Sequence, residues 1–172
     1  MSATPKPKPA RTPELALTIQ YGARSAQLPS RAKLRQWARA ALRRNARVTL
    51  RVVGAREARL LNLNYRGRDY ATNVLTFIYS SQSPLEGDIA ICAPVVAREA
   101  FARGISREQH YAHLTVHGLL HLQGHDHERG ADAKAMEKLE TRILAKLGFA
   151  DPYRDATHDG KRTTATDHKH GR

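Results

Sequence analysis

The segment HGLLHLQGHDH, residues 117 to 127, constrains the fold of this chain more than any other feature. Residues four apart lie on one face of an α-helix, so His117 and His121 point the same way if the segment is helical. Gly124 permits the left-handed backbone that ends a helix, and the chain can then bring a third histidine toward the same point. His127 is the better candidate for that third position, and His125 competes with it.

Three histidines that converge on one point predict a metal site. Three neutral imidazoles leave the fourth coordination position of a zinc ion open, which is typical of catalytic zinc. We therefore expect one zinc ion per chain, held by His117, His121 and His127, and hydrolytic chemistry. Nickel or cobalt also fits three imidazoles, so the sequence does not select the ion.

Three neighbouring side chains are candidates for supporting roles at this site. His113 lies one turn before His117 and could be another ligand or a neighbour. We favour roles around the ligands or toward the substrate for both His113 and His125. Asp126 could orient an imidazole, or it could be an exposed turn residue.

The same histidine spacing occurs in zinc peptidases of the pattern HExxHxxGxxH, in which a glutamate after the first histidine is the general base. Here that position is Gly118. Peptide hydrolysis would lose its usual proton shuttle, so a metallopeptidase is the weaker interpretation.

The rest of the chain predicts an α+β fold. Alternation at Leu15–Ile19 and Val48–Val52 and the apolar runs at residues 74–79 and 87–92 predict four strands. Five helices are predicted, one after Ser30, a short one ending before Gly67, one from Pro94 to Gly104, one beginning at Ser106, and one ending at Gly148. We expect a single domain with a mixed sheet of about four strands, about five helices and a zincin-like metal helix.

Composition divides the chain into three parts. Residues 1–13 contain four prolines and no apolar periodicity, so we expect a flexible basic arm. Residues 14–153 form the expected domain, and residues 154–172 are again polar and patternless, which predicts a flexible C-terminal tail.

The formal net charge of +13 favours a polyanionic partner such as nucleic acid. Residues 14–150 hold 21 lysines and arginines against 12 aspartates and glutamates, so the folded body is itself basic. Arginine recurs every fourth residue from Arg31 to Arg43, and within this row Arg35 and Arg39 are candidates for contacting phosphates. The alternative is an ordinary solvated helix face.

No run approaches the roughly 18 apolar residues that suggest a membrane span, and the N-terminus lacks the apolar core of a signal peptide. Cys92 is the single cysteine, which excludes an internal disulfide and a thiolate cluster. We expect a soluble, cytoplasmic protein.

Together with LNLNYRGRDYATNVLTF at residues 61–77 and GDIAIC at residues 87–92, the histidine motif resembles the YbeY family of bacterial endoribonucleases. The resemblance implies zinc bound by His117, His121 and His127, and it places the family's functional arginine at Arg66. Two positions depart from the family pattern. His125 stands where the family has tyrosine, which adds a possible competing ligand, and Thr76-Phe77-Ile78 replaces Ser-Phe-Pro, which affects the rim of the substrate groove.

The resemblance further implies cleavage of single-stranded RNA in 16S rRNA 3' end maturation and in ribosome quality control. It implies a small-subunit ribosomal protein and an assembly GTPase as partners. On this interpretation Arg66, His117 and His121 are catalytic, and Arg66, Arg35, Arg39 and His125 contact RNA. The alternative is a zinc-stabilised ribosome assembly factor whose nuclease activity is incidental.

Overall fold

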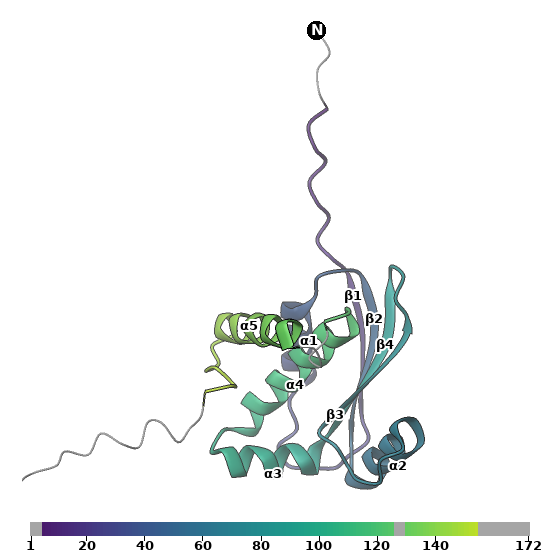
Figure 1. The fold of residues 1–172 in the computed structure, drawn as a ribbon, viewed down its shortest axis with the longest axis vertical. Coiled ribbons are helices and arrows are strands. Elements are labelled where there is room, and N and C mark those ends of the chain that lie inside the picture. The colour runs from purple at the N-terminus through teal and green to yellow at the C-terminus, as the bar shows by residue number, and fades with distance from the viewer. Residues whose placement is uncertain (1–4, 126–129, 155–172) are drawn as a thin grey trace, which may run out of the picture.

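The computed structural model describes residues 5–125 and 130–154. Within these residues the chain forms four strands and five helices, as the α+β prediction expected (Figure 1). In chain order the elements are β1 (Leu15–Tyr21), α1 (Arg31–Ala41), β2 (Ala46–Val53), α2 (Ala55–Arg66), β3 (Val74–Ser80), β4 (Leu85–Cys92), α3 (Ala93–Arg103), α4 (Arg107–Leu122) and α5 (Gly130–Lys146). Strand β4 begins two residues before its predicted start, because buried Leu85 already pairs with Ala46 of β2.

The strands form one mixed sheet in the order β1-β2-β4-β3. Strands β1, β2 and β4 are parallel, and β3 runs antiparallel to β4 at one edge. Successive side chains of a strand point to opposite faces. In β4, Ile89 and Ile91 accordingly join the larger hydrophobic core on one face, while Ala90 and Cys92 join a smaller core on the other. The predicted mixed sheet is confirmed.

The two faces of the sheet carry different helices. Helices α1, α4 and α5 lie on one side and α2 on the other (Figure 1). The buried residues Trp37 of α1, Leu119 of α4 and Met136 of α5 belong to the larger core with Ile89, whereas Ala58 of α2 belongs to the smaller one. Helix α4 is therefore enclosed between the sheet and two other helices, which fixes its position.

Local sequence signals set both ends of α4. At its start, the Ser106 hydroxyl accepts a hydrogen bond from the backbone N–H of Gln109 at 3.0 Å, the capping contact expected from the spacing of these residues. At its end, Gly124 has a φ of 94°, and the N–H of His125 donates to the carbonyl of Leu120 at 3.1 Å. The chain thus leaves the helix at the predicted glycine.

No helix in the described part of the chain is long and apolar enough to cross a membrane. Residues 5–14 form no regular secondary structure before β1. The division into an N-terminal arm, a domain and a C-terminal tail stays a prediction.

Candidate metal centre

Three histidines follow one another at single-turn intervals along α4. His113, His117 and His121 are partly buried, and their spacing of four residues brings them to the same side of the helix. The rings of His117 and His121 are nearly parallel, at an interplanar angle of 9° and a centroid separation of 6.5 Å. The predicted alignment of these two imidazoles is confirmed.

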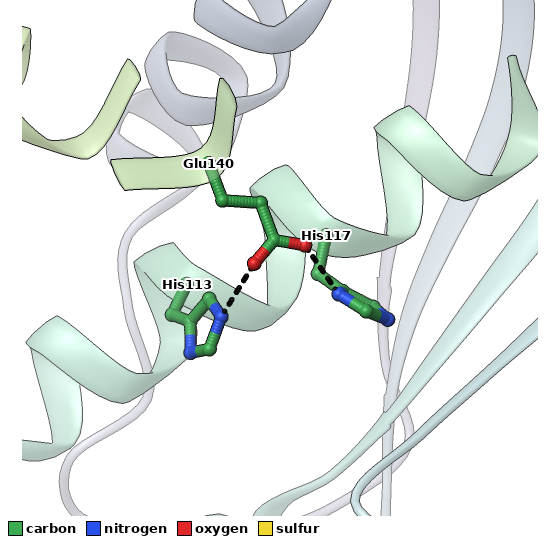
Figure 2. Close-up of side chains that lie close together, drawn as sticks. All are labelled: His113, His117 and Glu140. Carbon is green, nitrogen blue, oxygen red and sulfur yellow. Dashed lines mark hydrogen bonds and ion pairs between the residues drawn. The ribbon is translucent and has the colours of Figure 1, made fainter. Parts of the chain in front are cut away.

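A fully buried carboxylate from another helix meets this row. Glu140 of α5 is 0% exposed, and its two oxygens contact two histidines of α4 (Figure 2). Oε1 lies 2.5 Å from Nδ1 of His117, and Oε2 lies 3.0 Å from Nε2 of His113. His113, His117 and Glu140 each offer a ligand atom, all within 4.8 Å of one another, so this cluster could hold a metal ion.

The distances within the cluster fit hydrogen bonds better than shared coordination. Two ligands of one tetrahedral zinc ion stand about 3.3 Å apart, given metal–ligand bonds of about 2.0 Å. The separation of 2.5 Å between Glu140 and His117 is far shorter than that. We therefore interpret Glu140 as the partner that orients His117, a common arrangement around metal-binding histidines.

This contact determines which nitrogen of His117 is available to a ligand. An ionised carboxylate only accepts hydrogen bonds, so the Nδ1 that faces Glu140 must carry the hydrogen. Nε2 is then the unprotonated nitrogen, and Figure 2 shows it pointing away from Glu140. A neutral imidazole binds a transition metal through its unprotonated nitrogen, while its other ring nitrogen donates to a carboxylate. The donor set around His117 thus fits a metal ion.

The electrostatics of Glu140 also favour a cation nearby. Burial by itself raises the pKa of this carboxyl, but hydrogen bonds from His113, His117 and Tyr153 outweigh it and lower the pKa from 4.5 to about 2. The carboxyl is therefore ionised at neutral pH. Within residues 5–125 and 130–154 the basic side chains in contact with it are His113 and His117, with no lysine or arginine among them. A metal cation on the far side of His117 would balance this buried charge.

The third predicted ligand, His127, lies outside the described residues, as does Asp126. The ligand set His117, His121 and His127 therefore stays a prediction. His125 is described, partly buried, just after the turn at Gly124, and its predicted contact with substrate is untested.

The candidate RNA-binding arginines lie on two other helices. Arg66 is exposed in the last turn of α2, and α2 packs against the sheet face opposite α4 (Figure 1). Arg39 is exposed and Arg35 half-buried on α1, on the same side of the sheet as α4. The first arginine of their row, Arg31, donates instead to the carbonyl of Ile19 at 2.7 Å. The proposed roles of Arg66, Arg35 and Arg39 stay predictions.

Gly118 points into the core and not toward the histidines. A Cβ atom at this position would lie 3.0 Å from Cδ1 of Ile89 in β4. A glutamate here, as in the zinc peptidases, would crowd the Ile89 side chain and place a carboxylate in the apolar core. This packing supports the argument against a peptidase.

Sequence reasoning missed Glu140, although a signal was present. The predicted buried stripe of the last helix contained Met136, Leu139, Ile143 and Leu147. Glu140 lies four residues after Met136 and three before Ile143, so it occupies the same apolar face. An ionisable residue in a buried stripe needs a polar partner, and the partners are the histidines of α4.

Fold and site together define a class: a small α+β protein in which a buried helix presents histidines to a carboxylate from a neighbouring helix. The family model described as endoribonuclease YbeY matches residues 20–148. The chain belongs to the YbeY family.

Individual relatives support this assignment. The chain is 48% identical to the endoribonuclease YbeY of Nitrosomonas europaea over 153 residues, which cover 89% of this chain and 93% of the relative. It is 56% identical to that of Aromatoleum aromaticum over 142 residues, covering 81% and 92%. A solution structure of a protein from Thermotoga maritima matches this chain with a TM-score of 0.52 and 23% sequence identity. The match covers 80% of this chain and 99% of that one, and it shows the fold alone.

Proposed function

We propose that this chain is a single-strand-specific, metal-dependent endoribonuclease that acts in 16S rRNA 3' end maturation and in ribosome quality control. The observation that carries the proposal is the contact between Glu140 and Nδ1 of His117, whose ring lies nearly parallel to that of His121 one turn further along α4. Membership of a family named for endoribonuclease activity supplies the substrate class.

The roles of the residues follow from their chemistry. His117, His121 and His127 would hold one zinc ion, with Glu140 orienting His117. A metal ion bound there would lower the pKa of a coordinated water to about 7 and polarise the scissile phosphodiester. Arg66 would hold a phosphate in bidentate fashion, and its guanidinium would stabilise charge that develops during cleavage.

Attraction of RNA rests on the charge of the molecule. The net charge of +13 draws in a polyanion at long range. Arg35, Arg39 and His125 would contact the RNA close to the site. A small-subunit ribosomal protein and an assembly GTPase are the proposed protein partners, in the cytoplasm.

The test is the substitution His121→Ala in protein purified without a histidine-tag column. Zinc content and cleavage of an unstructured RNA are measured on the same sample, and both should be lost. The matched control is His110→Gln on the same helix, because His110 bonds to Glu99 at 3.1 Å and not to Glu140. Cleavage that persists in His121→Ala without metal would refute the proposal. Metal retained in His121→Ala but lost in Glu140→Gln would indicate coordination by His113, His117 and Glu140 instead.

A second candidate function is a zinc-stabilised ribosome assembly factor with incidental nuclease activity. The basic body favours it, because charge alone suffices to bind ribosomal RNA. A rescue experiment distinguishes the two functions. A variant that binds metal but does not cleave RNA is expressed in cells that lack the parent protein, and it should restore rRNA processing only if binding is the function. A metallopeptidase, the third candidate, would cleave a peptide library and leave RNA intact.

A further inference from the structure

The segment after α5 returns to the histidine row, where one contact joins it to α3 and one to α5. Pro152 is buried, and its carbonyl accepts a hydrogen bond from the guanidinium of Arg103 in α3. The Asp151 carboxylate accepts from the backbone N–H of Tyr153 at 2.9 Å and from the hydroxyl of Thr141 at 3.3 Å. The backbone at Tyr153 is therefore fixed relative to both α3 and α5.

This anchoring aims the Tyr153 side chain at the carboxylate that orients His117. The Tyr153 hydroxyl donates to Oε2 of Glu140, the oxygen that also contacts His113. The ring of Tyr153 packs edge-on against that of His113, with centroids 5.4 Å apart and an interplanar angle of 84°. Burial and the bond to Glu140 raise the pKa of Tyr153, so its hydroxyl keeps the proton that it donates.

Three donors thus hold one carboxylate at both oxygens. His117 takes Oε1, while His113 and Tyr153 take Oε2. The terminal torsion of a glutamate is broad and has no strong preference of its own, so contacts must fix the plane of the carboxylate. If Oε2 loses the Tyr153 hydroxyl, His113 alone holds that oxygen, so the plane of the carboxylate and the direction of the His117 ring are set less firmly.

We infer that Tyr153 is a positioning residue of the metal centre, which fixes the plane of the Glu140 carboxylate so that His117 presents Nε2 to the metal ion. The segment Asp151–Tyr153 is then part of the site, although it lies beyond residue 148, where the match to the family model ends. The inference rests on the metal-binding part of the proposed function and not on the reaction.

The test is Tyr153→Phe, which removes the hydroxyl and keeps the ring against His113. Zinc affinity is measured on the full-length chain by competition with a chromophoric chelator, and the coordination geometry by the visible spectrum of the cobalt(II)-loaded protein. We expect about three- to tenfold weaker zinc binding and a changed cobalt spectrum, because a hydrogen bond to a charged group is lost one step from the ligand. Glu140→Gln should weaken binding further, by about 10- to 100-fold.

The matched control is Tyr79→Phe. Its hydroxyl also donates to a carboxylate, that of Asp88, at 2.8 Å, but this pair lines a pocket with Leu61 and Tyr65 of α2, on the side of the sheet opposite α4 (Figure 1). This variant should bind zinc as the parent does. Urea unfolding of each metal-free variant measures any effect on the fold separately.

Zinc affinity and a cobalt spectrum in Tyr153→Phe equal to those of the parent would overturn the inference, even if the variant is less stable. A parent chain that binds no zinc would overturn it as well. A parent chain that binds zinc but leaves RNA intact would refute the proposed activity alone, and the Tyr153→Phe comparison would still decide the role of Tyr153.

Discussion

Gly118 of α4 lies directly against Ile89 of β4, so closely that a Cβ atom on Gly118 would stand 3.0 Å from Cδ1 and 3.1 Å from Cγ2 of the isoleucine. Helix α4 therefore lies tightly against the sheet at the residue after His117, the first predicted ligand. A side chain at residue 118 would require the Ile89 side chain or α4 itself to shift.

Gly118→Ala should lower the free energy of unfolding by about 1 kcal/mol, because overpacking outweighs the better helix propensity of alanine. Urea unfolding of the metal-free protein measures this change. In the background of Ile89→Val, which lacks the δ-methyl group, the same substitution should cost less. An equal cost in both backgrounds would contradict the proposed contact.

Arg66→Ala should leave zinc content and the unfolding midpoint unchanged and reduce RNA cleavage by about 100-fold or more, the usual effect of removing a group that stabilises transition-state charge. The control is Arg56→Ala, which removes an equally exposed guanidinium from the first turn of the same helix. If Arg66→Ala cleaves as well as the control, Arg66 has no catalytic role.

The double variant Arg35→Ser, Arg39→Ser should bind single-stranded RNA with a weaker dependence on salt. If both arginines contact phosphates, the slope of log K against log salt should fall in magnitude by about 1.4. The double variant Lys134→Ser, Lys138→Ser on α5 removes the same charge from another exposed surface. Equal slopes in the two double variants would show that the arginines act only through net charge.

His110 should make the metal-free protein less stable in acid. Burial lowers the pKa of His110, and contact with Glu99 only partly opposes this, while Arg103 and His113 lower it further. The unfolded chain therefore takes up a proton near pH 6.5, before the folded one does, so stability falls as the pH drops below about 6.5.

Urea unfolding at pH 7.5 and 5.5, with chelator present, measures this loss. His110→Gln can keep a hydrogen bond to Glu99 but does not titrate, so it should lose less stability on acidification than the parent. The same loss in both proteins would assign the effect to other groups.

Most of the fold could be predicted because its signals are local. The alternation of Leu15 to Ile19 depends on residues two apart, and the Ser106 cap and the turn at Gly124 depend on residues within one helical turn. The alignment of His117 with His121 is likewise a property of one helix. The insertion of β4 between β2 and β3 involves residues far apart in sequence, and no local pattern indicated that order.

The sequence by itself determined the helix, the spacing of its histidines and the glycine at which the chain turns, because each depends on near neighbours. Only the tertiary structure decided that Glu140 and Tyr153 meet that helix. Glu140 contacts His117, which is 23 residues away in sequence, and Tyr153 contacts His113, which is 40 residues away. Such contacts form when helices pack through their apolar faces, and packing depends on the whole core and not on any one segment.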